Sequence, residues 1–175
     1  MVKVGEKAPV FNADAVVAGQ IQRVSSNDLK KKWIVLFFYP RDFTFVCPTE
    51  LNAFARLEPD FKKLNAVVIG CSTDSAFSHK AWFERDLPNI KYPVLADTNH
   101  QIARAYNVLI EETGESLRGT FIIDPDGILQ YGAVSNLNVG RSTDETLRVL
   151  QALQTGGLCP IDWKPGQETL NKKKK

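Results

Sequence analysis

Short continuous apolar runs are the most regular feature of the chain. Residues 33–39 read WIVLFFY without a polar break, and residues 66–70 read AVVIG. Runs of this kind predict strands that are buried on both faces, because a strand with one solvent-facing side would alternate apolar and polar residues. Residues 120–123 predict a further strand, and Pro40 ends the first one.

Apolar residues with helical spacing follow the first strand. From Thr49 onward, large apolar side chains return every three or four positions, which places them on one face of an amphipathic helix. These residues are Leu51, Phe54, Leu57, Phe61 and Leu64. Shorter helices are expected near residues 76–85 and 99–105, with a short strand at 92–95 between them.

Turn signals predict two hairpins. The first is expected within residues 16–24, with Gly19 and Gln20 inside it. The second is expected where Pro125-Asp126-Gly127 forms a tight turn. The chain would then return along residues 128–131, antiparallel to the strand at 120–123.

The last helix is marked at both ends. Ser142-Thr143-Asp144-Glu145 has the pattern of a capping box, and Gly156-Gly157 would end the helix. Its apolar face would carry Leu147, Leu150 and Leu153.

This order of elements predicts an α/β fold with a mixed central sheet flanked by helices, which is the plan of thioredoxin-like folds. The length of 175 residues fits one domain, 1–175. It would begin with an N-terminal hairpin, and about 156–175 would form a C-terminal arm and tail. A fold alone does not assign a function.

The net charge and the length of the apolar runs argue against a nucleic-acid partner and against a membrane. The net charge is +2, but without Lys172–Lys175 the chain has 18 Lys and Arg against 20 Asp and Glu. We therefore expect no nucleic-acid partner, and we interpret the lysine run as a solvated end. The run at 33–39 is too short to span a membrane, and Lys3 and Glu6 interrupt a secretory signal. The prediction is a cytoplasmic protein without membrane association.

Three cysteines are present, Cys47, Cys71 and Cys159. An odd count without a secretory signal argues against a framework of structural disulfides, and buried free thiols are the ordinary alternative. No Cys-x-x-Cys occurs, and His79 and His100 lack ligand spacing to any cysteine. We therefore expect no metal and no cofactor.

Cys47 lies where the loop after the first strand meets the predicted helix. Pro48 is tolerated there because the amides of a first helical turn lack helical partners. Free N–H groups and the positive end of the helix dipole favour a thiolate, which is the nucleophilic form of cysteine. A cysteine at such a turn is also expected to be accessible. Cys71 instead closes an apolar run and is expected to be packed and inert.

Residues 40–50, PRDFTFVCPTE, resemble the Pro-x-x-x-Thr-x-x-Cys signature of peroxiredoxins, in the form seen in the typical two-cysteine group. The resemblance continues at four further segments, 72–75, 77–82, 117–124 and 156–160. Within the group, the chain is most similar to the bacterial peroxidase component of alkyl hydroperoxide reductase.

The resemblance implies a role for each residue of a peroxide pocket. Cys47 corresponds to the peroxidatic cysteine, and Arg118 to the arginine that stabilises the thiolate and orients the peroxide. Thr44 would hydrogen-bond the peroxide, and Pro40 would shield the pocket from water. Such chemistry needs fixed donors aimed at the charge that develops on the departing oxygen, and an arginine with its planar fork suits this task.

The resemblance also implies partners. Glu50 and Arg141 match a pair that holds the arginine network, and Cys159 of the partner subunit would resolve the oxidised Cys47 as an intersubunit disulfide. The chain would be a homodimer, assembling to a decamer, with the segment around Phe77 between dimers. Its substrates would be hydrogen peroxide and organic hydroperoxides. Its reductant would be a thiol protein, either thioredoxin-like or a dedicated disulfide reductase.

Other interpretations remain open for single residues and for the whole chain. Alone, Arg118 would be an ordinary surface residue, Thr44 a helix cap and Glu50 a first-turn acid. His79 and Trp82 are read as structural or interface residues. A general thiol–disulfide oxidoreductase and a holdase chaperone are the alternative functions, although the first normally needs the missing Cys-x-x-Cys.

The chain departs from the relatives that are most sensitive to overoxidation. Those carry Gly-Gly-Leu-Gly before the arginine strand and Tyr-Phe in an added C-terminal helix. Here residues 111–116 read EETGES and residues 167–175 read QETLNKKKK. We therefore expect Cys47 to resist conversion to sulfinic acid.

Overall fold

The computed structural model describes residues 2–170 of the chain, so the interpretation of Lys172–Lys175 lies outside the described residues. Two compact units are present, one ending at Arg141 and the other beginning at Ser142. The second unit starts earlier than the arm predicted from about residue 156. The expectation of a single domain stays a prediction.

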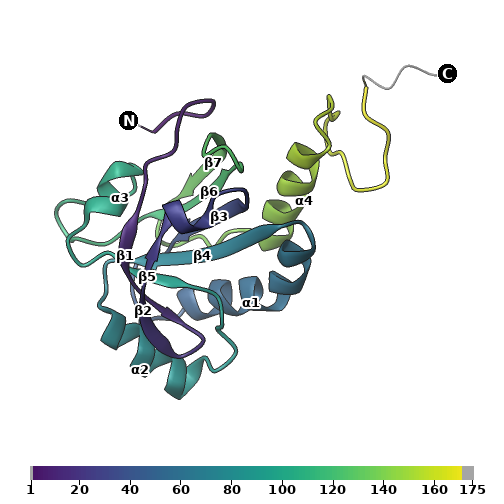
Figure 1. The fold of residues 1–175 in the computed structure, drawn as a ribbon. Coiled ribbons are helices and arrows are strands. Elements are labelled where there is room, and N and C mark those ends of the chain that lie inside the picture. The colour runs from purple at the N-terminus through teal and green to yellow at the C-terminus, as the bar shows by residue number, and fades with distance from the viewer. Residues whose placement is uncertain (1, 171–175) are drawn as a thin grey trace. The chain divides into compact units, whose positions relative to one another are not determined.

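The first unit contains a mixed sheet of seven strands in the order β2-β1-β5-β4-β3-β6-β7 (Figure 1). Strands β3, β4 and β5 are parallel, and the other neighbours are antiparallel. The strands are β1 Asn12–Val17, β2 Gln20–Ser25, β3 Trp33–Phe38, β4 Ala66–Ser72, β5 Val94–Ala96, β6 Arg118–Ile123 and β7 Leu129–Ser135. The predicted thioredoxin-like plan is confirmed.

Three α-helices of the first unit connect these strands. They are α1 Cys47–Lys63, α2 Ala76–Asp86 and α3 Gln101–Ala105, and a short 3-10 helix, η1 Ser26–Leu29, precedes β3. In Figure 1, α1 and α2 lie on one side of the sheet and α3 on the other. None of the helices in the described part of the chain is long and apolar enough to cross a membrane.

Strand β3 is buried on both faces, as its continuous apolar sequence predicts. On one face, Phe37 stacks on Phe54 of α1 with ring centroids 4.2 Å apart. On the other, Phe38 meets Phe121 edge to face at 5.9 Å. Because both faces of β3 are covered, its end is held in place. The loop that leads to Cys47 starts from this fixed end.

The predicted N-terminal hairpin is present, and its strands extend beyond residues 16–24. Val17 pairs with Gln20, so Ala18 and Gly19 form a two-residue turn. Both have positive φ, 49° and 82°, which matches the turn that fits the right-handed twist of paired strands.

The second unit begins with α4, Thr143–Gln154. The Ser142 hydroxyl caps it by accepting from the Glu145 N–H at 3.1 Å. The Glu145 carboxylate binds Arg148 at 2.6 Å rather than closing the second half of the predicted capping box. Beyond α4 the chain is folded back, because Arg148 donates to the Trp163 carbonyl at 2.8 Å and the Leu170 N–H to the Leu158 carbonyl at 2.8 Å.

Gly119 in β6 has no room for a side chain. An added Cβ would lie 2.8 Å from both Phe121 Cε2 and Val108 Cγ1. We expect Gly119→Ala to lower the free energy of unfolding by about 1–3 kcal/mol through overpacking, as measured by urea denaturation. Gly140→Ala is the matched control, because its Cβ would meet Val46 Cγ1 at an ordinary 3.5 Å. Equal losses in both variants would contradict this explanation.

Candidate active site

Cys47 is the first residue of α1, as predicted. Strand β3 ends at Phe38, and a loop through residues 39–46 carries the chain to the helix. The Val46 carbonyl accepts from the Thr49 N–H at 3.0 Å and from the Glu50 N–H at 3.4 Å. The sulfur is therefore carried by the opening turn of a 17-residue helix.

The expectation that Cys47 is accessible was wrong, because only 1% of the residue is exposed. Its position at a turn describes the backbone, whereas the side chain faces inward toward the start of β6. There Nη1 of Arg118 lies 3.5 Å from the sulfur. The thiol is thus enclosed beside a cation.

Arg118 is the first residue of β6, and its side chain is 4% exposed. Its Nε donates to the Leu137 carbonyl at 2.8 Å. Its Nη1 donates to Oε2 of Glu50 at 2.7 Å as well as approaching the Cys47 sulfur. Contacts on both sides of the guanidinium fix its plane, so its charge has a defined position relative to the sulfur.

Glu50 lies between two arginines. It is one turn along α1 from Cys47, and its side chain is 2% exposed. Arg141 donates from Nε to Oε1 at 2.9 Å and from its backbone N–H to the same oxygen at 3.1 Å. Arg118 holds the other oxygen. Two cations and one anion give this buried cluster a net charge of +1, and a thiolate on Cys47 would make it neutral.

Arg141 joins α1 to the ends of two strands. Its Nη1 donates to the Gly119 carbonyl at 2.6 Å and to the Thr120 hydroxyl at 3.0 Å, and its Nη2 donates to the Phe38 carbonyl. Burial lowers the pKa of Arg141 from its ordinary value, and Glu50 opposes that shift. These bonds fix the carboxylate that in turn orients Arg118.

Thr44 and Pro40 lie on the loop before Cys47. The Thr44 hydroxyl donates to the Arg41 carbonyl at 2.9 Å, so its oxygen remains an acceptor for another donor. Pro40 is buried directly after β3. The structure therefore brings Cys47, Glu50, Arg118 and Arg141 into contact, with Thr44 and Pro40 on the adjoining loop.

Cys159 belongs to the second unit, beyond the end of α4. It is partly buried, and its sulfur lies 3.4 Å from the Thr155 hydroxyl and 3.6 Å from the Ala152 carbonyl. All three cysteines of the chain are free thiols in this structure.

Asp42 is a structural residue of the site loop that the sequence analysis missed. It is 4% exposed and accepts from the Tyr39 hydroxyl at 2.8 Å and from the Ser78 hydroxyl at 2.7 Å. Its backbone N–H donates to Asp74 at 2.9 Å. The only sequence signal was an acid within a loop that is rich in aromatic residues. Asp42 anchors this loop to α2 and to the residues that follow β4.

His79 completes this anchor. It is fully buried, with Nδ1 2.8 Å from the Asp42 carboxylate and Nε2 3.1 Å from the Leu95 carbonyl. Each ring nitrogen therefore lies within hydrogen-bond distance of an oxygen atom. Burial, followed by Asp42, raises the pKa of Tyr39 well above its ordinary value, so Tyr39 remains a donor. The structural interpretation of His79 agrees with these contacts.

Cys71 lies inside β4 and is fully buried. Burial raises the pKa of its thiol well above the ordinary value, and Asp97 raises it further. The expected packed role is confirmed, and the low thiolate fraction leaves this cysteine a poor nucleophile.

Fold and site together define a thiol peroxidase on a thioredoxin-like sheet. The AhpC/TSA family matches residues 4–132. Bacillus subtilis YkuU, which carries a provisional peroxiredoxin name, is 56% identical over 95% of this chain and 97% of its own length. Peroxiredoxin prdx-2 of Caenorhabditis elegans is 51% identical over 95% of this chain and 88% of its own.

Solved structures agree with these relatives. The reduced 2-Cys peroxiredoxin of Plasmodium vivax superposes with a TM-score of 0.93, at 38% identity, over 97% of this chain and 93% of its own. Enterococcus faecalis AhpC gives a TM-score of 0.87, also at 38% identity, over 91% of this chain and all of its own. The chain belongs to the AhpC/TSA family, as a typical two-cysteine peroxiredoxin, and is a thiol-dependent peroxidase.

Removing the Arg141 side chain should break its ion pair with Glu50 and its bonds to the Gly119 and Phe38 carbonyls. We expect Arg141→Ala to lower the free energy of unfolding by about 3–5 kcal/mol, the usual cost of breaking a buried ion pair. Urea denaturation measures this loss. Arg104→Ala is the control, because its pair with Glu111 at 2.8 Å is exposed and should contribute little. Similar losses in both variants would count against this account of Arg141.

Cys71 and Cys159 should differ in their reaction with N-ethylmaleimide. In the native protein at mildly alkaline pH we expect Cys71 to stay unlabelled, because its raised pKa and burial deny it a reactive thiolate. Cys159 should react readily, and Cys71 should react once urea unfolds the chain. Peptide mass spectrometry measures each site. Native labelling of Cys71 as fast as Cys159 would refute this assignment.

Proposed function

We propose that Cys47 is the peroxidatic nucleophile of this peroxidase. The observation that carries the proposal is the buried cluster in which Arg118, Arg141 and Glu50 leave one positive charge unbalanced beside the sulfur. Unpaired buried charge is costly, and a thiolate on Cys47 would complete the charge balance of the cluster. No histidine base is then needed.

The chemical step is a displacement at oxygen. The Cys47 thiolate attacks the terminal oxygen of a hydroperoxide, an S–O bond forms and the O–O bond breaks. The departing oxygen takes up a proton from water, which leaves an alcohol or water and a sulfenic acid on Cys47. Arg118 donates to the charge that grows on the departing oxygen. The Thr44 oxygen accepts the peroxide's hydrogen, and Pro40 keeps water out.

Cys159 of the partner subunit then resolves the sulfenic acid. Its sulfur attacks the Cys47 sulfur, an S–S bond forms, and hydroxide leaves with the thiol proton as water. The sulfurs must approach to about 2 Å, whereas Cys47 is 1% exposed, so the first turn of α1 must unwind. Two features support this: Val46 provides no side-chain cap, and the Glu50 N–H bond to its carbonyl is long.

Assembly and reduction complete the proposal. The chain works in the cytoplasm as a homodimer that assembles into a decamer, and residues 156–175 serve as its arm. Exposed aromatic side chains support such contacts, since Phe45 is 94% and Phe77 78% exposed. Thiol exchange with a thioredoxin-like protein or a dedicated disulfide reductase reopens the disulfide. Substrates include hydrogen peroxide and organic hydroperoxides.

A non-reducing gel after peroxide treatment tests the intersubunit cycle. The wild-type protein should form a covalent dimer, which is lost in both Cys47→Ser and Cys159→Ser and retained in Cys71→Ala. Peroxide consumption in the first turnover should vanish in Cys47→Ser and persist in Cys159→Ser. A covalent dimer in either of these two variants would show a different pairing. If Cys47→Ser still fully prevented the aggregation of an unfolded client protein, this would indicate an additional chaperone function.

Overoxidation should be slow in this protein. Residues 110–115 form a tight turn, with the Gly114 N–H donating to the Ile110 carbonyl at 2.8 Å, where sensitive relatives have Gly-Gly-Leu-Gly. We expect sulfinic acid on Cys47 to accumulate only over many turnovers in excess peroxide, as followed by mass spectrometry. Cys159→Ser, which cannot resolve, should overoxidise quickly. Rapid sulfinic acid formation at low peroxide in the wild type would contradict the expectation.

A further inference from the structure

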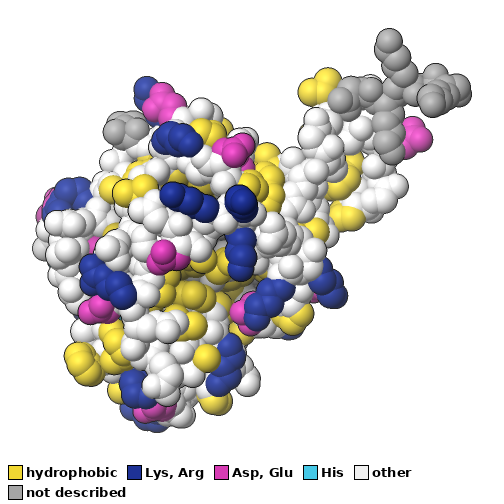
Figure 2. All heavy atoms as spheres, in the orientation of Figure 1, with side chains coloured by type: hydrophobic (Ala, Val, Ile, Leu, Met, Phe, Trp, Pro, Cys, Tyr) yellow, Lys and Arg dark blue, Asp and Glu magenta, His cyan; other side chains and the backbone are white. Residues whose placement is uncertain are grey.

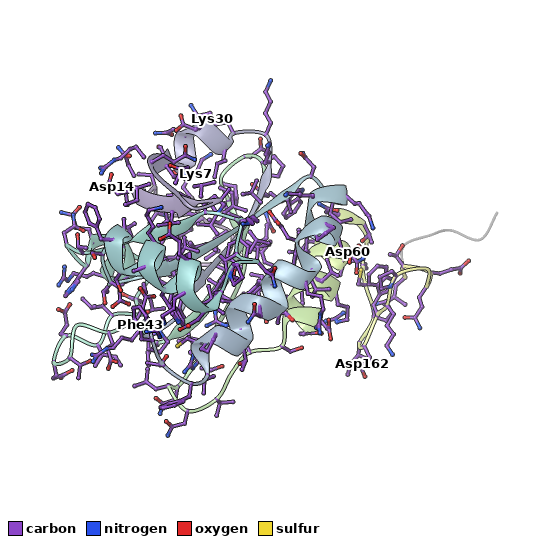
Figure 3. All side chains as sticks on the ribbon, turned by 90° about the horizontal axis from the view of Figure 1, so that it is seen from below. Lys7, Asp14, Lys30, Phe43, Asp60 and Asp162 are labelled. Atoms are coloured by element: carbon purple, nitrogen blue, oxygen red, sulfur yellow. The ribbon has the colours of Figure 1, made fainter. Side chains whose placement is uncertain are left out.

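A groove lies at the end of β3 and β6 opposite to the active site. It has a volume of about 580 Å³ and is lined by the segment around Pro9, the residues between β2 and β3, and the β6–β7 turn. Ile34 at the start of β3 and Ile123 at the end of β6 line it, whereas Cys47 and Arg118 belong to the other ends of these strands. In Figure 3, Lys7 and Lys30 lie on the side away from Phe43 of the active-site loop.

The lining of the groove is largely apolar. Ile34 and Ile123 are 5% and 3% exposed, so they form a fixed surface, and Leu29 and Pro9 lie beside them. Val10 also lines the groove and is 73% exposed. The volume falls in the range of about 300–1,000 Å³ that small-molecule sites occupy.

Four lysines surround this apolar lining: Lys7, Lys30, Lys31 and Lys32. Within residues 2–170, no ion pair involves the three consecutive lysines. Elsewhere neighbouring lysines are paired, as Lys62 is with Glu58 at 2.8 Å. Figure 2 shows dark blue lysine and arginine side chains next to yellow apolar surface on the face that it draws. The lysines therefore present unneutralised positive charge to the groove.

Two acids, Asp124 and Asp126, also line the groove, so the charges of its lining sum to +2. The Asp124 carboxylate accepts from the N–H groups of Asp126 and Ile128, both at 2.9 Å, and from Gln130 at 2.7 Å, so it holds the β6–β7 turn. Lys7 donates to the backbone carbonyl of Asp126 rather than to a carboxylate. Because the lysines outnumber the acids in this lining, the groove would attract an anion.

The walls of the groove are held in place. Lys31 has a φ of 71°, a left-handed conformation that costs a residue other than glycine roughly 1–2 kcal/mol. Asn65 stabilises it by donating from Nδ2 to the Lys31 carbonyl at 3.0 Å. On the opposite wall, the Ala8 N–H donates to the Gly127 carbonyl at 2.9 Å. Because both walls are tethered, a ligand would find the groove already formed.

We propose that this groove binds a single-chain amphipathic carboxylate, of the chemical class of a medium-chain fatty acid. Its carboxylate would pair with Lys30, Lys31 and Lys32, and its chain would cover Ile34 and Ile123. A free inorganic anion would use the lysines and leave the apolar lining exposed. A neutral hydrocarbon would leave the lysines unpaired, so both parts of the groove are used only by a molecule with both properties.

Isothermal titration of the full chain with dodecanoate, below its micelle concentration, tests the proposal. The wild-type protein should bind saturably at one site per chain. The triple variant Lys30→Gln, Lys31→Gln, Lys32→Gln should bind at least tenfold more weakly. The matched control removes three exposed charges elsewhere, as Lys63→Gln, Lys91→Gln, Lys164→Gln, and should bind as the wild type does. Absence of saturable binding, or equal weakening in both variants, overturns the proposal.

Two further probes separate the contributions of charge and chain. Dodecyltrimethylammonium keeps the chain and reverses the charge, and inorganic phosphate keeps negative charge without a chain; both should bind at least tenfold more weakly than dodecanoate. Val10→Ser should weaken dodecanoate binding severalfold, and its exposure makes a folding defect unexpected. Equal binding of either probe and dodecanoate contradicts the proposal. Peroxide consumption should be unchanged in the triple variant, which confirms that it is folded.

Discussion

Charge balance inside a buried cluster is the constraint on which the active site depends. Arg118, Arg141 and Glu50 are almost completely enclosed, and together they carry one positive charge more than they can pair. In the proposed mechanism, a thiolate on Cys47 supplies the missing negative charge. The cluster is assembled from the start of α1, the start of β6 and the residue that ends the first unit, so residues far apart in the sequence meet beside the sulfur.

Burial of the same sulfur opposes the second half of the proposed cycle. A small peroxide can reach an enclosed thiolate, whereas a second cysteine needs the backbone around Cys47 to move. Side-chain hydrogen bonds hold the residues around the site in place. Arg141 is tied to Phe38, Gly119 and Glu50, and Asp42 anchors the loop. The opening turn of α1 is held to the Val46 carbonyl by the Thr49 and Glu50 N–H groups and by the Thr49 hydroxyl at 2.6 Å, and these bonds must break when the turn unwinds.

The sequence predicted features that depend on local periodicity, and it failed where contacts are long-range. Continuous apolar runs identified β3 and β4, and spacing identified α1 and its first residue, Cys47. Arg118 was assignable only through family resemblance, because its contact with Glu50 joins residues 68 positions apart. The Asp42–His79 contact spans 37 positions and was missed. Accessibility of Cys47 was misjudged because a turn position does not determine where the side chain points. The groove beside Lys30, Lys31 and Lys32 is formed by three separate segments of the chain. No single sequence pattern could therefore predict it.

The account is tested most directly by the rate at which Cys47 is oxidised in a single turnover with hydrogen peroxide. Arg118→Gln removes the charge beside the sulfur and a donor to the departing oxygen. The account predicts that this variant, shown to be folded by circular dichroism, is oxidised about 10²–10³ times more slowly, whereas the exposed replacement Arg104→Gln retains the wild-type rate. Oxidation of Arg118→Gln at the wild-type rate would contradict the central role of the cluster.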